Sequence, residues 1–327
     1  MMRPARARTA ALNLVTAMVA TVVTLGAVEL YYRATYRENW YLEPEFRPGH
    51  FPRLNADGLR DVDYGPRQPG TYRILLLGDS FTFGSGVEDD AAIWPAIIER
   101  RLGEIRPLGD VSKYEVLNGG IAGSLTDKWV ALYQQQRQPD FFPPDLVLVV
   151  FFLRDGTRME HVSNELAAAN LERIRTDPLT RVSTAYRYFS EKWLAIHFAA
   201  LLERFFVDSY AGSPEATAEW RAAQHNILTI RDIAVSDGTR FGMAIFPMLY
   251  GFEQDPYPFQ TAMDALATFC RTNGIAHLSL LPAFRGRRAS DLWVSEANKH
   301  PNVEGHAIAA RALLPFVLQL IGGSPAS

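Results

Sequence analysis

The sequence predicts an α/β protein whose parallel five-stranded sheet is covered by helices on both faces. One observation and one general rule support this prediction. Short, continuously apolar segments, typical of strands that are buried on both faces, alternate with amphipathic segments of helical period. Connections between such strands are right-handed crossovers, which bring the carboxyl ends of all strands to one edge of the sheet.

The first segment of the chain is a candidate membrane span. An uncharged stretch from Thr9 to Val28 has arginines before it and tyrosines after it, namely Arg3, Arg6, Arg8, Tyr31 and Tyr32. About 20 such residues can cross a bilayer, the basic side stays cytoplasmic, and tyrosines suit the interface. We therefore expect residues 1–35 to be an uncleaved signal anchor that contacts the membrane through residues 9–32. A cleavable signal peptide is the alternative, although its apolar region is usually only about 7 to 15 residues.

Residues 36–71 are rich in proline, glycine and charge, and they indicate a tether and an irregular lead-in. The folded domain is expected over residues 72–327. Its strands are predicted at Ile74–Leu77, Tyr114–Leu117, Asp145–Leu153, Phe241–Pro247 and Ile275–Leu281, where the chain is predominantly apolar. Its helices are predicted at Asp89–Leu102, Leu125–Gln136, Phe259–Thr272 and Val303–Ile321, where the pattern is amphipathic.

A helical insertion is predicted between the third and fourth strands, over about residues 160–239. It is dense in helix formers, for example at Asn164–Ile174 and Glu191–Phe206, and no strand pattern interrupts it. Its aromatic residues recur at helical spacing, which favours a core role for Tyr186, Tyr188, Phe189, Trp193, Phe205 and Phe206. The sequence leaves open whether the insertion is a cap over the sheet edge, a partner-docking surface or helical packing.

Composition excludes several functions. The net charge of −3, without a dense basic cluster, argues against a nucleic-acid partner. Cys270 is the only cysteine, so an intrachain disulfide is impossible, and we expect this thiol to be a small buried group. The histidines are scattered, and the glycines match neither a phosphate-binding loop nor a dinucleotide fingerprint. We therefore expect no metal and no cofactor.

Four loops carry polar groups at the predicted edge. They are Gly78-Asp79-Ser80, Asn118–Gly123, Leu153–Gly156 and Asn298–Asn302. Ser80 lies in a strand-to-helix turn, where open α/β sheets bind their ligands and free backbone N–H groups suit an oxyanion. Because Gly, Asp and Ser are also common turn residues, an ordinary turn is equally compatible with this segment alone. A serine needs a base to become a nucleophile, and a histidine in the His300-Pro301 loop can supply one.

The chain resembles the SGNH, or GDSL-type, hydrolases. The resemblance covers roughly residues 55–320 and is carried by Gly78–Gly84, Asn118–Gly123 and His300-Pro301-Asn302 with Gly305-His306. It implies a flavodoxin-like three-layer fold and the hydrolysis or transfer of acyl esters. It further implies that Ser80 is the nucleophile and His300 the base, and that the N–H groups of Ser80 and Gly123 form the oxyanion hole. By the same analogy Asp79 shapes the turn, and we expect His306 to be structural.

Two positions depart from the family pattern. Arg154 stands where the family usually has an asparagine that donates to the oxyanion; it is a permanently charged donor that can bind an acidic substrate group or pair with a carboxylate such as Asp155. Asn298 stands at the usual aspartate position, and an amide cannot stabilise imidazolium with charge. The enzyme is then a Ser–His dyad, or Glu296 or Asp291 substitutes for the aspartate, or the activity is weak.

The sequence therefore predicts a serine esterase or deacylase that is anchored in a bacterial inner membrane by one span, with its catalytic domain on the periplasmic side. Its substrate would be an acylated small molecule or glycan, with O-acetyl groups on extracytoplasmic glycans among the candidates. An O-acyltransferase acting on exported polysaccharide shares the same acyl-enzyme and is the alternative. A third hypothesis is a catalytically degenerate binding or scaffold protein, in which Arg154 and Asn298 mark lost chemistry; no protein partner follows from the sequence.

Overall fold

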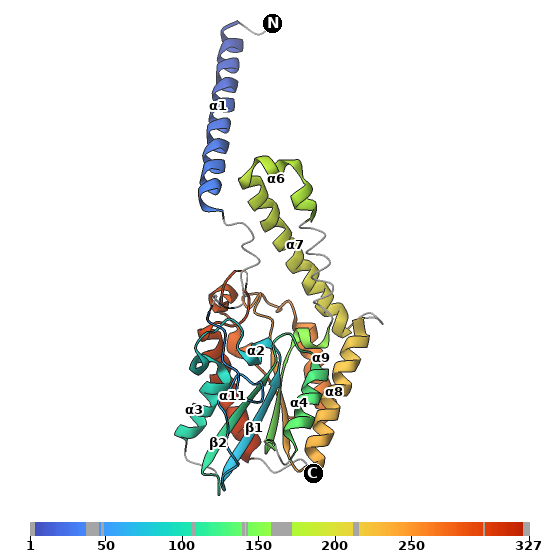
Figure 1. The fold of residues 1–327 in the computed structure, drawn as a ribbon. Helices are drawn as coiled ribbons and strands as arrows, with labels where there is room; N and C mark the ends of the chain where they lie inside the picture. The colour runs from blue at the N-terminus through green and yellow to red at the C-terminus, as the bar shows by residue number, and fades with distance from the viewer. Residues whose placement is uncertain are drawn as a thin grey trace. The chain divides into compact units, whose positions relative to one another are not determined.

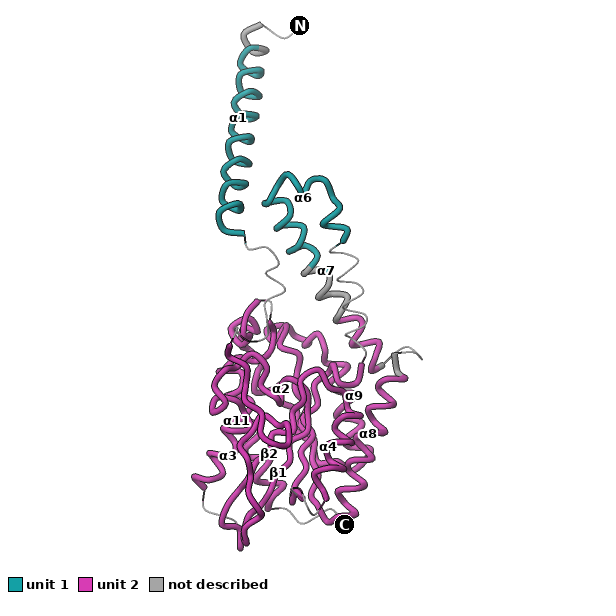
Figure 2. Tube along the Cα trace, in the orientation of Figure 1, with its two compact units in different colours: residues 1–40, 159–202 teal, residues 41–158, 203–327 magenta. Residues whose placement is uncertain are grey.

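The computed structural model describes residues 4–36, 46, 49–105, 109–138, 141, 143–157, 172–211, 216–296 and 298–322. Two compact units make up the chain, residues 1–40 with 159–202 and residues 41–158 with 203–327 (Figure 2). Arg3, His161 and the first part of the helix predicted at residues 164–174 lie outside the described residues.

The second unit contains the predicted sheet. Its strands are β1 (Thr71–Gly78), β2 (Lys113–Gly120), β3 (Leu146–Phe152), β4 (Arg240–Phe246) and β5 (His277–Ser279). They form one five-stranded sheet in the order β2-β1-β3-β4-β5, and every neighbouring pair is parallel. This is the doubly wound order of flavodoxin-like folds, whose topological switch point lies between the first and third strands. The predicted fold class is therefore confirmed, and β1 leads directly to the switch point.

Three predicted strands differ from the observed ones by two or more residues at an end, and the first of them, β1, begins at Thr71 rather than at Ile74. β2 continues through Gly119 and Gly120, which pair with the end of β1. Glycine is required there, since a Cβ at Gly119 would lie 2.4 Å from the Leu76 carbonyl oxygen. β5 is shorter than the predicted Ile275–Leu281, because a short helix, α10 (Leu281–Phe284), begins where the apolar run continues.

Helices cover both faces of the sheet. The long ones are α3 (Trp94–Glu104), α4 (Thr126–Gln136), α8 (Ala216–Ser236), α9 (Gln260–Thr272) and α11 (Val303–Gly322). Figure 1 shows α3 and α11 on one side of the sheet and α4, α8 and α9 on the other. The helix predicted from residue 89 begins later, because a 3₁₀ turn at Asp90–Ala92, capped by Asp89, precedes α3. Cys270 is buried on α9, as expected.

Short elements fill the connections. They are the short helices α2 (Ser80–Phe83) and α6 (Pro178–Val182) and the 3₁₀ turns η2 (Asp90–Ala92), η3 (Leu153–Gly156) and η4 (Ala289–Leu292). Of these, α2 and η3 directly follow β1 and β3, so they stand at the carboxyl edge of the sheet.

The first unit contains α1 (Pro4–Thr35), α6 and most of α7 (Thr184–Ala211). The segment Arg8–Thr35 is long and apolar enough to cross a membrane, and its most apolar window has a mean hydropathy of 2.0 with no residue buried. α11 is also long and apolar, but 56% of its most apolar window is buried, as in the core helix of a soluble domain.

The insertion is helical, as predicted, in the residues that the structure describes. The prediction that its aromatic residues are core was wrong for part of the set. Phe206 is fully buried, whereas Phe189 and Trp193 are 54% and 51% exposed and Tyr186 is also exposed. The first half of α7 lies in the small unit, where few elements are available to cover a second helix face.

Candidate active site

The turn after β1 places Ser80 at the start of α2. Asp79 is the N-cap, and its Oδ1 accepts a hydrogen bond from the Phe81 N–H at 2.8 Å. Gly84, in the left-handed conformation with φ +85°, ends the helix after a single turn. At Gly78 no side chain fits, because a Cβ would lie 2.1 Å from Thr82 Oγ1 and 3.0 Å from the Val150 carbonyl oxygen. The Gly-Asp-Ser sequence therefore satisfies local requirements of the turn while it buries the Ser80 side chain.

The loop before α11 holds His300. Asn302 accepts the Gly305 N–H through its side-chain oxygen and thereby caps α11, and its amide nitrogen donates to the carbonyls of Asp291 and Trp293. The Val294 N–H donates to the His300 carbonyl at 3.0 Å. Because both sides of the loop are tied together, the position of the His300 ring is set by the fold.

Ser80, His300 and Asn298 form one continuous hydrogen-bonded chain. Ser80 Oγ lies 2.8 Å from His300 Nε2, and His300 Nδ1 lies 2.6 Å from Asn298 Oδ1. The contact of Ser80 Oγ with Asp79 Oδ2 is longer, at 3.4 Å. The histidine is therefore the closer acceptor for the serine hydroxyl, and this is the arrangement of a nucleophile with its base.

The backbone of His300 orients the Asn298 amide. The His300 backbone N–H is 3.1 Å from Asn298 Oδ1 and can only donate, so the side-chain oxygen must face it. That same oxygen then faces Nδ1, and an oxygen acceptor there requires the proton to reside on Nδ1. Nε2 consequently carries the lone pair that accepts the Ser80 hydroxyl. The neutral amide thus selects the productive tautomer, although it adds no charge.

His300 is neutral at neutral pH. Burial and the nearby Arg154 guanidinium lower its pKa to about 4. A base with so low a pKa is deprotonated above about pH 5 but is a weak proton acceptor. Stabilisation of the charge that forms on the ring would have to come from elsewhere in the site.

Arg154 forms its ion pair with Asp79 and not with Asp155. The Arg154 Nη2 to Asp79 Oδ2 distance is 3.1 Å, and both side chains are largely buried. Burial raises the pKa of Asp79, and the charge of Arg154 partly offsets that effect. Asp155 instead accepts the Phe152 N–H at 2.7 Å, and burial together with the charge of Asp79 raises its pKa well above the usual range. Arg154 is thus tied to the residue next to Ser80.

Gly123 lies in a turn that follows β2. The Ser124 N–H donates to the Ile121 carbonyl at 3.1 Å, and Gly123 has φ +73°, which favours glycine. The turn is anchored to the first loop, since the Ile121 N–H donates to the Gly78 carbonyl at 3.0 Å. Among the described residues, the N–H groups of Ser80 and Gly123 donate to no protein acceptor.

The alternatives for the missing acid do not take the position beside His300. The hydrogen-bond partner of Nδ1 is Asn298 rather than Asp291 or Glu296. Asp291 is exposed and lies 3.8 Å from Arg288. His306 is fully buried, and its Nδ1 accepts the Trp94 backbone N–H at 3.2 Å, which is a structural role.

Sequence reasoning missed Arg60. Its guanidinium is fully buried, donates to the carbonyls of Gly84 and Val87 at 2.6 Å each, and pairs with Asp90 at 2.7 Å. It therefore holds the segment that follows α2. An arginine in an irregular lead-in carries no sequence signal for such a role, because its acceptors are backbone carbonyls more than 20 residues away.

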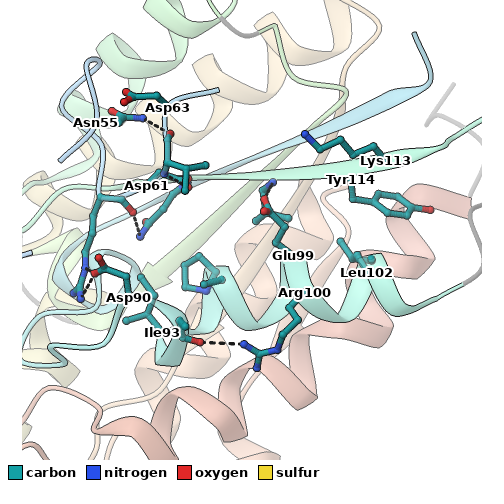
Figure 3. A pocket seen from close by; sticks show the side chains of 18 of the residues that line it. Asn55, Asp61, Asp63, Asp90, Ile93, Glu99, Arg100, Leu102, Lys113 and Tyr114 are labelled. Atoms are coloured by element: carbon teal, nitrogen blue, oxygen red, sulfur yellow. Dashed lines mark hydrogen bonds and ion pairs between the residues drawn. The ribbon is translucent and has the colours of Figure 1, made fainter. Parts of the chain in front are cut away.

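A large cavity of about 860 Å³, which Arg60 and Asp90 help to line, lies beside β2 and α3 (Figure 3). Its partly buried carboxylates serve the open edge of the sheet: Asp61 accepts the Asn118 N–H at 2.8 Å and Glu99 accepts the Val116 N–H at 2.6 Å. Burial raises the pKa of Asp61 to about 6. This cavity includes neither Ser80 nor His300, and we assign its polar groups to edge protection. In the described part of the chain, no cluster of three or more His, Cys, Asp or Glu side chains could hold a metal ion.

No protein-family model matches the chain, and no curated protein matches its sequence. Solved structures with a similar fold include a two-domain esterase active on acetylated mannans (15% identity, TM-score 0.45, 79% of this chain and 51% of that one). Others are a carbohydrate acetylesterase family member from Sinorhizobium meliloti (12%, 0.43, 77% and 100%) and a GDSL-like lipase from Bacteroides thetaiotaomicron (12%, 0.37, 76% and 88%). The chain spans about half the length of the mannan esterase.

Proposed function

We propose that this chain is a membrane-anchored serine esterase of the SGNH/GDSL type. The observation that supports the activity best is the hydrogen-bonded chain from Ser80 through His300 to Asn298, with distances of 2.8 and 2.6 Å. Ser80 stands at the switch point of the sheet, where ligands of such folds bind, and the other two side chains reach it from the loop before α11. A structural serine would not require a partly buried histidine in the tautomer that accepts its proton.

In the proposed mechanism Ser80 Oγ attacks the carbonyl carbon of an ester while its proton passes to His300 Nε2. A carbon–oxygen bond forms, and the carbonyl electrons move to the oxygen, which accepts hydrogen bonds from the N–H groups of Ser80 and Gly123. Collapse of this intermediate breaks the bond to the alcohol, which leaves with the proton from Nε2. Water then repeats the sequence on the acyl-serine, releases the acid and restores Ser80.

Arg154 is proposed to take the place of the family's asparagine as a donor to the oxyanion. Its guanidinium is fixed next to Ser80 by the ion pair with Asp79, and it has further N–H groups besides the one used there. A permanent positive charge favours an anionic intermediate, yet it disfavours the imidazolium that forms at the same time. The low pKa of His300 reflects burial first and this second effect of Arg154 after it.

The proposed substrates are O-acyl esters of small molecules or glycans, O-acetyl groups included. The proposed location is a bacterial inner membrane, with α1 as the single span and the second unit on the periplasmic side. The arginines before Thr9 support this orientation, because basic flanks stay in the cytoplasm. α1 supports the anchor through its length, its apolar composition and its exposure.

The test is an ester assay on the full chain in detergent, with p-nitrophenyl acetate and an acetylated polysaccharide as substrates. We expect acetate release by the parent and a loss of at least about 10³-fold in Ser80→Ala. Equal turnover by the two proteins would eliminate the mechanism. Transfer of the acetyl group to an added glycan, without release of acetate, would instead identify an acyltransferase that uses the same acyl-serine. Inactivity of both proteins would favour a binding or scaffold protein.

A further inference from the structure

The first unit contains a strongly basic cavity. It measures about 660 Å³ and lies where the carboxyl-terminal end of α1 meets α6 and α7. Four arginines line it, Arg33, Arg175, Arg181 and Arg187, together with hydroxyl groups that include those of Thr180 and Thr184. Among the described residues that line it there is no aspartate or glutamate.

Specific contacts build this cavity. Glu29, near the end of α1, accepts hydrogen bonds from Ser183 Oγ at 2.8 Å and from the Thr184 N–H at 2.9 Å, so it caps the start of α7. The Tyr32 ring stacks on Tyr188 with 4.5 Å between the ring centroids. The end of the membrane helix is therefore fixed to the α6–α7 hairpin, which is drawn with α1 as one unit in Figure 2.

The positive charge of the cavity is only partly compensated. Arg33 pairs with Glu29 at 2.7 Å, and Arg187 pairs with Glu191 at 3.2 Å. Arg175 and Arg181 make no ion pair with any residue that the structure describes. Guanidinium groups bind phosphate oxygens in forked geometry, so two such groups in one cavity suit a phosphate ester.

The location of the cavity favours a lipid over a soluble anion. A helix from Thr9 to Val28 spans about 30 Å, and Arg33 lies roughly 8 Å further along the axis, which is the depth of the headgroup layer. The same hairpin exposes four large apolar side chains, Leu179, Val182, Phe189 and Trp193. Apolar and aromatic side chains next to basic ones are typical of segments that lie in a membrane interface.

We propose that the end of α1 and the α6–α7 hairpin bind the phosphate group of an anionic membrane lipid. Arg175 and Arg181 contact the phosphate, and the exposed apolar side chains enter the interface beside it. The inference rests on the membrane placement proposed above and is independent of the ester chemistry. It assigns a function to the part of the helical insertion whose aromatic side chains are exposed.

The experiment measures phosphate-ligand binding to the full chain in a neutral detergent by titration calorimetry. The probes are dihexanoyl phosphatidic acid, dihexanoyl phosphatidylcholine and inorganic phosphate. The test variant is Arg175→Gln/Arg181→Gln, which removes the two arginines of the cavity that pair with no described carboxylate. The matched control is Arg53→Gln/Arg271→Gln, which removes the same charge from exposed positions of the second unit.

We expect the parent and the control to bind phosphatidic acid equally, and the test variant to bind it at least about tenfold more weakly. Phosphatidylcholine and inorganic phosphate should each bind the parent at least about tenfold more weakly than phosphatidic acid. Equal binding by parent and test variant, or no binding by the parent, would overturn the proposal. Equally tight binding of inorganic phosphate would assign the site to a soluble anion and would also overturn it.

Two further readouts separate this proposal from the proposed function. Ester turnover of the test variant should equal that of the parent, because the variant positions are not in the catalytic site. If the chain shows no specific binding of phosphatidic acid but still resists extraction from membranes, α1 is an anchor without a lipid site. If the chain is washed from membranes, the membrane placement itself is wrong.

Discussion

The side-chain oxygen of Asn298 lies 2.6 Å from Nδ1 of His300 and also accepts the backbone N–H of that histidine. A side-chain amide can present either its oxygen or its NH₂ group to Nδ1. The NH₂ group would force the imidazole into the unproductive tautomer. In serine proteases, replacement of the triad aspartate by asparagine lowers turnover by about 10⁴-fold because the imidazole adopts that tautomer. Here the backbone donor fixes the oxygen toward the ring, so in the proposed mechanism Asn298 takes the orienting role of the acid without its charge.

Two substitutions at Asn298 separate orientation from charge. Asn298→Ala removes the acceptor at Nδ1, and we expect kcat/KM to fall by roughly 10²-fold or more because the tautomer is no longer selected. Asn298→Asp adds charge to an existing geometry, and we expect a rise of roughly tenfold. Steady-state ester assays measure both. An unchanged kcat/KM in Asn298→Ala would mean that the residue does not position His300.

The pH profile of kcat/KM should rise through a single ionisation near pH 4 and stay level through neutrality. His300 must be neutral to accept the Ser80 proton, and burial with the charge of Arg154 lowers its pKa to about 4. Below that pH the ring is protonated and the rate falls about tenfold per pH unit. In Asn298→Asp the added carboxylate favours the charged ring, so the same limb should move to higher pH. A profile with its midpoint at the ordinary histidine pKa of 6.5 would contradict the buried, Arg154-facing environment.

The pair of Arg154 with Asp79 should stabilise the fold around Ser80. Arg154→Met leaves a buried carboxylate without its partner, and we expect the free energy of unfolding to drop by about 3 kcal/mol. In Arg154→Met/Asp79→Asn much of that loss should be recovered, since an amide oxygen can still accept the Phe81 N–H. Urea unfolding in detergent measures the cycle. Additive losses in the double variant would show that the two side chains do not interact.

Arg154 should also affect turnover beyond its effect on stability. Arg154→Lys retains the charge but replaces the forked guanidinium by a single ammonium group, so we expect most of the stability and part of the activity to be kept. Arg154→Met should lower kcat more than it raises KM for neutral acetyl esters, because an oxyanion donor acts in the transition state. A change confined to KM, and only for acidic esters, would instead identify Arg154 as a binding group for an acidic substrate.

The anchor makes a separate prediction. The full chain should remain with membranes during alkaline carbonate extraction, whereas a chain that begins at residue 36 should be released. Extraction would expose about 20 apolar residues of α1 to water. The cost is roughly 0.8 kcal/mol for each CH₂ group that leaves the membrane. Immunoblots of the pellet and supernatant make the comparison. Release of the full chain would show that α1 is not a membrane span.

The sheet could be predicted from the sequence, and so could the residues that its topology brings to one edge. Apolar runs end at defined turns, and parallel strands bring those turns to one edge, so Ser80 and the His300 loop could be placed together before any distance was known. The acceptor on Nδ1 could not be decided in advance. Asn298, Asp291 and Glu296 all precede His300 closely, and only the loop backbone determines which of them faces the ring.

Other features depend on contacts that local sequence does not specify. Arg154 has Asp155 as its neighbour in sequence, yet its partner is Asp79, 75 residues away. Phe189 and Trp193 repeat at helical spacing as core residues do, but periodicity cannot say whether another element covers that face. β5 ends early because a helix begins at Leu281-Pro282, inside the apolar run. An apolar run this short does not reveal whether it forms a strand or a helix.

The central claim is that Ser80 is a nucleophile activated by His300, and one measurement tests it directly. The full chain is incubated with a serine-directed fluorophosphonate, and the adduct is located by intact and peptide mass spectrometry. We expect one adduct per chain on Ser80, none in Ser80→Ala, and labelling slowed by at least about 10²-fold in His300→Ala. No adduct on Ser80 in the folded parent protein, or labelling that His300→Ala does not slow, would contradict the account.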